Sequence, residues 1–478
     1  MLGTGAYRCL SFKFAVNQRL IALRMQSNMD FSVAPWGGGG CLGANETVAA
    51  AATGKYNDVR LMHGYGRWFN SSLNAGHDVG SFSAVCYLTA LQMKKLPGHA
   101  DRPIGLIQAS VGGTIIEEWM DPAALEICLP ASDSKSHANA SAQPDYGEHN
   151  SDDFYAMIQP LAPMSLTGIL WYQGENNMVQ NYQAANKSWD FQDYYGCLFK
   201  AKVNSWRQLF RSPEMFYGFV SLAAYGSDDS NDTERSADGL PRIRLDQNSV
   251  LSLPNTGVAL ALDLGDNGKI PWTPPSGRHG GIHPRNKTEV ARRLVLAYAK
   301  ASLGLNVIAS GPVFAAATAV TAANVVTLSF TNTDGGVVLS PTAQCKPTPC
   351  CPPAGVPRHK NNDQGVPFEV LVDGVYVLPA KTTITMDGKS VQLALPAGVK
   401  ATGVRYCQQG YPMCVLRNGA GLPAMPFVAN ITGIVDPALS RQQAAMKLDD
   451  GVALVCSLAW LPTRLGCIGV APRVDDLP

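Results

Sequence analysis

The sequence predicts an α/β domain built on a mostly parallel sheet, followed by a small antiparallel β domain. Up to about residue 304, short apolar runs alternate with helical patterns, as in a parallel sheet covered by helices on both faces. Beyond it, short runs rich in β-branched residues are separated by Gly, Pro and Asp-Gly turns, which is typical of antiparallel strands. The 478 residues also exceed the usual size of one domain. We therefore expect domains at 20–304 and 305–432, with 433–478 a tail of unknown structure.

The elements of the first domain follow from local patterns. Apolar runs predict strands at Leu20–Leu23, Val59–Met62, Ile104–Ser110, Gly168–Trp171, Met215–Ser221 and Val258–Ala261. Amphipathic spacing predicts helices at Ser83–Lys95, Asn186–Leu209 and Thr288–Leu303. In the last helix, Arg292 and Arg293 are expected on a different face from Val290 and Leu294. The polar segments 129–153 and 222–240 are predicted to be long surface loops.

The second domain has weaker but consistent signals. Strands are predicted within Val320–Thr331, Phe368–Leu371, Val391–Leu395 and Val404–Tyr406. Residues 340–366 are rich in proline and predict an irregular loop.

Composition excludes several classes of function. The formal net charge is +1, and no basic stripe or acidic tail points to nucleic acid or to a cationic partner. The sequence has no run of 18 apolar residues, so it predicts no membrane span. Cys350-Cys351 lack the Cys-x2-Cys spacing of zinc ligands, and no His-x3-His follows them nearby. We expect no metal and no cofactor.

Cysteines and glycosylation sequons indicate the secretory route. The chain has 12 cysteines, which we interpret as disulfide-forming, with Cys407–Cys414 the favoured pair. It also carries seven Asn-x-Ser/Thr sequons without proline at x, at Asn45, Asn70, Asn139, Asn186, Asn231, Asn286 and Asn430. A glycosylated protein that is secreted, or delivered to a lysosome or vacuole, fits both observations.

Two distant segments offer a nucleophile and a base. Ser27 follows the apolar run Leu20–Leu23, at the strand end where open α/β sheets place their ligands. A serine hydroxyl needs a base within hydrogen-bond reach, and His283 precedes the last predicted helix. Alone, Ser27 is more commonly a turn or a helix cap, and His283 a loop residue. Between them stand PIGLIQASVGGTIIEEW at 103–119 and GILWYQGENN at 168–177.

In order and spacing, these four blocks resemble the sialate O-acetylesterase family of the SGNH-hydrolase superfamily. The resemblance implies a three-layer α/β/α, flavodoxin-like domain that removes O-acetyl groups from a sugar, with sialic acid as the family substrate. An acetylesterase acting on another polysaccharide, such as acetylxylan, and a non-catalytic glycan-binding relative remain alternatives. The family pattern has Gly where this chain has Met25, and it has further sequence before the serine block. We therefore expect a truncated or mis-assembled start.

The resemblance implies roles for named residues. Ser27 attacks the ester carbonyl, and His283 takes its proton and returns one to the leaving oxygen. The oxyanion needs donors already in place: the N–H groups of Ser27 and Gly113, and the side chain of Asn177, with Gln173 as its competitor. Without the family match, Gly112-Gly113 fits a plain strand-to-helix turn equally well.

The third member of the triad and the sugar pocket stay open. Many superfamily members have Asp where this chain has Gly280, so Asp263, Asp266 or a backbone carbonyl must orient His283, and we favour a Ser–His dyad. Candidates for the sugar pocket are Trp171, Glu175, Trp119, Arg244 and Gln247. Core packing for the tryptophans and a surface ion pair for Arg244 are the alternatives.

Overall fold

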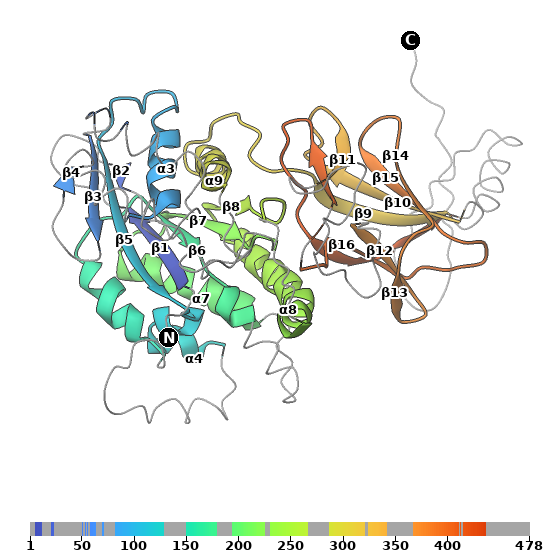
Figure 1. Cartoon of the computed structure of the whole chain (residues 1–478), viewed down its shortest axis with the longest axis horizontal. Coiled ribbons are helices and arrows are strands. Elements are labelled where there is room, and N and C mark those ends of the chain that lie inside the picture. The colour runs from blue at the N-terminus through green and yellow to red at the C-terminus, as the bar shows by residue number, and fades with distance from the viewer. Residues whose placement is uncertain are drawn as a thin grey trace, which may run out of the picture.

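A computed structural model shows a mixed α/β fold followed by several antiparallel sheets (Figure 1). It describes residues 5–11, 21–22, 50, 53, 55, 58–63, 69–70, 82–128, 150–178, 194–224, 230–265, 286–320, 324–341, 367–410, 412 and 414–435.

The first sheet has the strand order β4-β3-β5-β1-β6-β7-β8, with β2 paired to β5. Its strands are β1 (Gly5–Ser11), β2 (Ile21–Ala22), β3 (Val59–His63), β4 (Phe69–Asn70), β5 (Ile104–Gly112), β6 (Gly168–Tyr172), β7 (Phe216–Ser221) and β8 (Thr256–Leu260). β3 runs parallel to β5, and β6, β7 and β8 run parallel to one another. β1 is antiparallel to both β5 and β6, so these two strands also share one direction. Five of the predicted strands are thus confirmed in a largely parallel sheet.

The centre of this sheet differs from the prediction. The run Leu20–Leu23 forms only the two-residue strand β2, which is parallel to β5 as expected. The place between β5 and β6 is taken by β1, which was not predicted. A strand there pairs the backbone groups that β5 and β6 turn toward each other, and buried backbone groups rarely stay unpaired.

Helices lie beside the sheet, and four of those described pack in two pairs. They are α3 (Ala84–Met93), α4 (Pro122–Glu126), α7 (Tyr194–Leu209), α8 (Ser230–Asn248) and α9 (Lys287–Ala301). In Figure 1, α3 and α9 lie together on one side of the strands, and α7 and α8 lie together on the other. Asn286 caps α9, because its side-chain oxygen accepts a hydrogen bond from the N–H of Glu289 at 3.2 Å.

Two predictions about helices were wrong. Residues 222–240 were expected to form a loop, yet α8 begins at Ser230 and continues through Pro241. Its buried face includes the polar residues Arg244 and Gln247. The helix therefore lacks the apolar periodicity from which a buried helix face is predicted. Arg293 was expected away from the apolar face of α9, but it lies three residues after Val290 and is buried beside it.

The second part is built from antiparallel pairs, except for one parallel strand at its end. Its strands are β9 (Val313–Val320), β10 (Val325–Thr331), β11 (Val337–Pro341), β12 (Phe368–Val372), β13 (Val375–Val377), β14 (Lys381–Ile384), β15 (Ser390–Ala394), β16 (Gly403–Tyr406), β17 (Cys414–Asn418), β18 (Phe427–Asn430) and β19 (Gly433–Val435). They form sheets of order β14-β15-β10-β9-β19 and β13-β12-β16-β18, with β11 paired to β17. Because β19 pairs with β9, this part extends past the boundary expected at residue 432.

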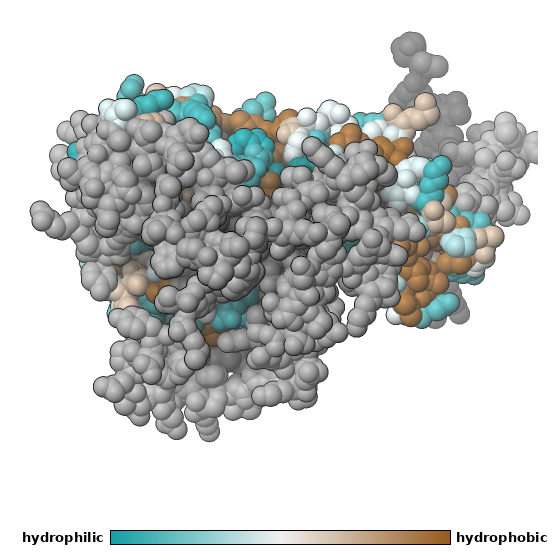
Figure 2. All heavy atoms as spheres, in the orientation of Figure 1, coloured by the Kyte–Doolittle hydropathy of each residue, from teal (hydrophilic) through white to brown (hydrophobic). Residues whose placement is uncertain are grey.

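Aromatic side chains join the two larger β sheets. The rings of Phe314 on β9 and Phe427 on β18 stack with centroids 4.2 Å apart, and Tyr406 on β16 stacks on Phe427 at 5.7 Å. The same core includes Leu260 and Leu262 from the end of β8, so the two parts share buried apolar surface. Val375 and Val377 stay exposed on β13, where Figure 2 shows hydrophobic residues at the surface.

The expected disulfide Cys407–Cys414 was wrong. Cys407 is a buried free thiol, whereas Cys414 is disulfide-bonded. The structure instead joins Cys128, just after α4, to Cys197 in α7, and Cys86 in α3 is also disulfide-bonded. Within the described ranges, no helix is both long and apolar enough to cross a membrane.

Candidate active site

The candidate site lies at the edge of the first sheet where β5, β6, β7 and β8 end. Parallel strands carry their carboxyl ends to one edge, and open α/β sheets bind ligands there. After β5 the chain turns at Gly113, whose φ of +75° favours glycine. After β6 it turns at Gly174, where φ is +140° and an added Cβ would come within 2.9 Å of Ile243. In two of the four sequence blocks, the strand is therefore followed by a glycine turn at this edge.

Asn177 joins the segment after β6 to the segment after β5. Its Oδ1 accepts from the backbone N–H of Ile116 at 2.9 Å, and its Nδ2 donates to Oε2 of Glu117 at 2.9 Å. Both partners belong to η1, the 3-10 helix Ile116–Trp119. Burial raises the pKa of Glu117, although the hydrogen bond from Asn177 opposes that rise. Asn177 is buried, with both ends of its amide in use.

Gln173 is a second buried amide in the same network. Its Nε2 donates to the carbonyl of Thr114 at 3.1 Å and to Oδ1 of Asn177 at 2.6 Å. Its Oε1 accepts from the hydroxyl of Tyr195 at 2.9 Å. Gln247 on α8 extends the network, because its Nε2 donates to the carbonyl of Gln173 at 2.9 Å and its Oε1 accepts from the N–H of Leu222 at 3.1 Å. These amides hold the ends of β6 and β7 to the turn after β5.

Asn176 is a residue that the sequence analysis did not select. It is half-buried, and its Nδ2 donates to the carbonyl of Gly113 at 2.5 Å. This contact puts a side-chain amide beside the glycine expected to supply an oxyanion donor. The signal was in the sequence, since Asn176 and Asn177 are adjacent in the same block.

Both tryptophans selected for the sugar pocket lie in the core. Trp171 is fully buried under α7, with Nζ of Lys202 2.8 Å from its ring centroid and the ring of Trp206 edge-on at 5.9 Å. Trp119 is also fully buried and donates from Nε1 to Oγ1 of Thr114 at 2.9 Å. Neither ring face is open to a sugar in this structure. Glu175 is half-buried, and its charge helps to raise the pKa of Tyr172, behind the larger effect of burial.

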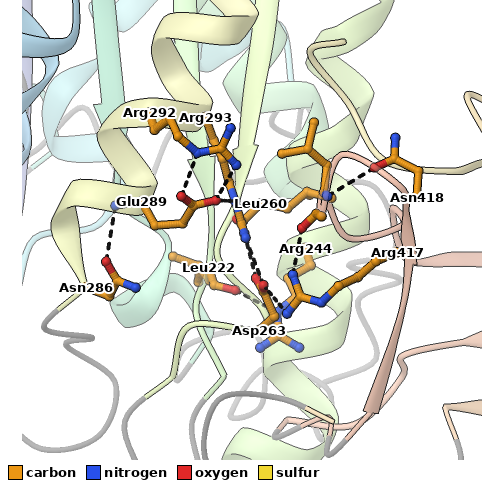
Figure 3. Close-up of polar contacts among 12 residues, drawn as sticks. Leu222, Arg244, Leu260, Asp263, Asn286, Glu289, Arg292, Arg293, Arg417 and Asn418 are labelled. Atoms are coloured by element: carbon orange, nitrogen blue, oxygen red, sulfur yellow. Dashed lines mark hydrogen bonds and ion pairs between the residues drawn. The ribbon is translucent and has the colours of Figure 1, made fainter. Parts of the chain in front are cut away.

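Arg244 makes structural contacts rather than a surface ion pair. It is fully buried, and its donors reach the carbonyls of Leu222 and Ala223 at 2.9 and 2.8 Å. Further donors reach the carbonyls of Gln409 and Gly410, each at 2.9 Å, in the second part. Burial lowers the pKa of Arg244 to about 10. In Figure 3 its guanidinium lies below Asp263, close to where the two parts meet.

Asp263 is one of the two carboxylates considered for orienting the base. Its Oδ1 accepts from Nη1 of Arg293 at 2.6 Å, and its Oδ2 accepts from Nη2 of the same residue at 2.9 Å. Nη2 of Arg417, on β17, lies 2.7 Å from Oδ2 (Figure 3). Burial acts to raise the pKa of Asp263, but the two arginines outweigh it and hold that pKa below its ordinary value. Two guanidinium groups thus occupy this carboxylate.

The fourth block reaches the same edge. Lys287, its last residue, begins α9, is fully buried and holds Nζ 5.0 Å from the ring centroid of Tyr172 at the end of β6. Ser27, His283 and Asp266 lie outside the described residues. Among those described, no group of three or more His, Cys, Asp or Glu side chains could hold a metal ion.

A family model for carbohydrate esterases, described as sialic acid-specific acetylesterase, matches residues 18–270. The chain belongs to this family. The match includes Ser27, Gly113 and the 173–177 segment, and it ends before His283.

Known relatives agree with this membership. The chain is 35% identical to the human sialate O-acetylesterase over 241 residues, which are 47% of this chain and 40% of the human protein. It is 32% identical to the mouse sialate O-acetylesterase over 262 residues, which cover 47% of this chain and 43% of that protein. The matched region thus spans less than half the length of either relative.

The fold has a relative among solved structures. A carbohydrate acetylesterase from Xanthomonas citri superposes with a TM-score of 0.61, covering 85% of this chain and 79% of that chain. At 23% sequence identity, this likeness concerns the fold alone.

Proposed function

We propose that this chain is a carbohydrate O-acetylesterase, with Ser27 as nucleophile and His283 as general base. The observation that carries the proposal is the convergence of three sequence blocks at one sheet edge. Asn176 contacts Gly113, and Lys287 contacts Tyr172, so the segments after β5 and β6 adjoin the start of α9. Membership of the acetylesterase family supports the reaction class.

We infer that the first part adopts the three-layer SGNH-type arrangement. The pairing of α3 with α9 and of α7 with α8, beside a largely parallel sheet, supports it. We also propose the secretory route for the protein, because the disulfide Cys128–Cys197 suits an oxidising compartment.

The mechanism needs donors for the oxyanion. The N–H groups of Ser27 and Gly113 are proposed for two of them. For the third, both amides of the sequence hypothesis are buried in a network, whereas Asn176 is half-buried beside Gly113. We therefore add Asn176 as the preferred side-chain donor. Asn177 and Gln173 then hold the surrounding backbone, and Glu175 remains the candidate for contact with the sugar.

The partners of Asp263 bear on whether this carboxylate orients His283. A carboxylate shared by two arginines is poorly suited to accept a hydrogen bond from an imidazole as well. A Ser–His dyad, or a triad with another acceptor, is the mechanism we favour.

The decisive experiment is hydrolysis of a generic acetyl ester by the wild type and by Ser27→Ala. The proposal expects Ser27→Ala to lose at least about 10³-fold in kcat/KM with an unchanged melting temperature. A loss below tenfold in a folded variant contradicts the nucleophile. Comparing the wild-type rates on 9-O-acetylated sialic acid and acetylated xylan selects the substrate class. No hydrolysis of any of the three favours the glycan-binding alternative.

The donor is tested by a matched pair of variants. Asn176→Ala is expected to lower kcat by about 10²-fold while keeping the fold, which is the usual scale for one oxyanion donor. Asn177→Ala is expected to lower the melting temperature, because it leaves Glu117 and the N–H of Ile116 without their buried partner. The reverse pattern restores Asn177 as the donor.

A further inference from the structure

A buried cluster of charges lies where the α/β part meets the β part. Asp263 stands between Arg293 on α9 and Arg417 on β17 (Figure 3). Nε of Arg293 also reaches Oε1 of Glu289 at 2.8 Å, and Nη1 of Arg417 donates to the carbonyl of Gly421 at 2.9 Å. The cluster therefore connects three elements from two parts of the chain.

These charged side chains are largely buried, so each must keep its partners in place. The side chain of Asp263 is 0% exposed and that of Arg293 only 4%, while that of Arg417 is 17% exposed. A carboxylate withdrawn from water is stable only where cations and hydrogen bonds replace the lost solvation. Removing one arginine leaves that replacement incomplete, so the segment bearing Asp263 is expected to shift.

The position of the cluster in the chain links it to the proposed active site. Asp263 follows the end of β8 by three residues, and Arg293 lies in the second turn of α9. These two elements flank, in sequence, the segment that holds His283. α9 also begins with Lys287, whose Nζ contacts the ring of Tyr172. The pair Asp263–Arg293 thus ties together both elements next to the proposed base.

We propose that Arg417 is a positioning residue for the esterase, acting from the β part. Through Asp263 it fixes the end of β8 against the start of α9, and so sets the geometry at the edge where the reaction occurs. This inference rests on the proposed function and extends it, because it gives the β part a role in catalysis beyond stability. Arg417 itself does not touch the substrate.

The chain offers a matched control in Arg405. Its Nε lies 2.9 Å from Oε2 of Glu369, its side chain is 22% exposed, and that of Glu369 is 2% exposed. Both residues belong to the β part, on β16 and β12. Arg405→Met therefore removes an ion pair of similar burial without touching β8 or α9.

The test compares Arg417→Met, Arg417→Lys and Arg405→Met in the full chain. Kinetics on an acetyl ester should show that Arg417→Met lowers kcat at least about tenfold with KM within about twofold, which is a loss expressed in the transition state. Arg417→Lys, which keeps the charge, should recover part of kcat. Arg405→Met should leave kcat within about twofold of wild type, even where its melting temperature falls as far as that of Arg417→Met. Equal kcat for the two Met variants overturns the proposal.

Hydrogen exchange supplies a readout that does not depend on activity. Arg417→Met should raise amide exchange at residues 260–265 and 286–293, whereas Arg405→Met should raise it only around β12 and β16. Unchanged protection at 260–265 and 286–293 overturns the positioning role. An inactive wild type that still shows the expected exchange pattern contradicts the proposed esterase and leaves the link between the two parts standing.

Discussion

Arg244→Met separates a structural role for this residue from a role in binding the substrate. The variant keeps a long apolar stem but removes the guanidinium, whose donors reach four backbone carbonyls, those of Leu222, Ala223, Gln409 and Gly410. Arg244 is fully buried, so water does not readily replace the lost donors.

The size of the effect follows from these contacts. A hydrogen bond to a charged group contributes about 1.5–3 kcal/mol. The sum over four such bonds is an upper limit, and the net loss of unfolding free energy is well below it, because other effects offset part of the sum. The guanidinium is costly to bury, as its lowered pKa indicates, and methionine recovers some apolar packing. Each buried carbonyl left without a donor costs about 1–3 kcal/mol, and relaxation offsets part of the sum, so we expect Arg244→Met to lose about 4 kcal/mol of unfolding free energy. In a large domain this lowers the melting temperature by about 8 °C or more.

The assay is thermal and urea unfolding, with acetylesterase kinetics on the same samples. Arg292→Met is the matched control, because the side chain of Arg292 is 39% exposed and its ion pair is with Glu289 on the same helix. That variant should lose less than about 1 kcal/mol. If Arg244→Met melts like wild type while KM for an acetylated sugar rises tenfold, the structural argument fails and the substrate role returns.

Three further predictions follow from buried groups. Cys128→Ser opens a disulfide that joins residues 69 positions apart, and chain entropy predicts a loss of about 4 kcal/mol in urea unfolding; Cys197→Ser, which opens the same disulfide, should match it. Burial raises the pKa of Glu117, so the folded chain binds this proton more tightly than the unfolded chain. Its unfolding free energy should therefore fall as pH rises above the ordinary pKa of Glu, and Glu117→Gln should remove that fall; parallel pH curves for the two proteins would exclude it. Burial raises the pKa of the Cys407 thiol to about 12, so iodoacetamide near pH 8 should modify Cys407 only after unfolding, as read by peptide mass spectrometry.

The sequence predicted the strands of the first sheet well because they are buried on both faces. Every residue of β6 and of β7 is buried, so each appears as an uninterrupted apolar run. The same logic failed for α8, where the buried stripe contains Arg244 and Gln247 and a proline lies inside the helix. A polar residue that satisfies backbone groups inside a protein resembles a surface residue in the sequence.

The candidate site was predictable as a set of segments, but not atom by atom. The glycine turns and the polar residues after β6 were recognised from the motif. Which of two adjacent asparagines lies beside Gly113 depends on how the chain leaves Gly174, and no spacing rule decides it. Likewise, one of the two arginines that pair with Asp263 is 154 positions away at Arg417, in another part of the chain. Contacts between residues so far apart in the sequence are set by tertiary packing, which local sequence patterns do not encode.

The core shared by Leu260, Leu262 and the β sheets bears on how this family could be engineered or could evolve by recombination. A crossover placed near residue 304, at the junction expected from the sequence, would leave these two leucines with the donor of the first part and their neighbours with the donor of the second. A transplanted β part would then need side chains that fit a foreign β8, and an arginine at the place of Arg417. Chimeras should therefore succeed more often when the residues at 260–263 travel with the β part, as substitutions within the recipient, than when whole modules are joined at the apparent linker.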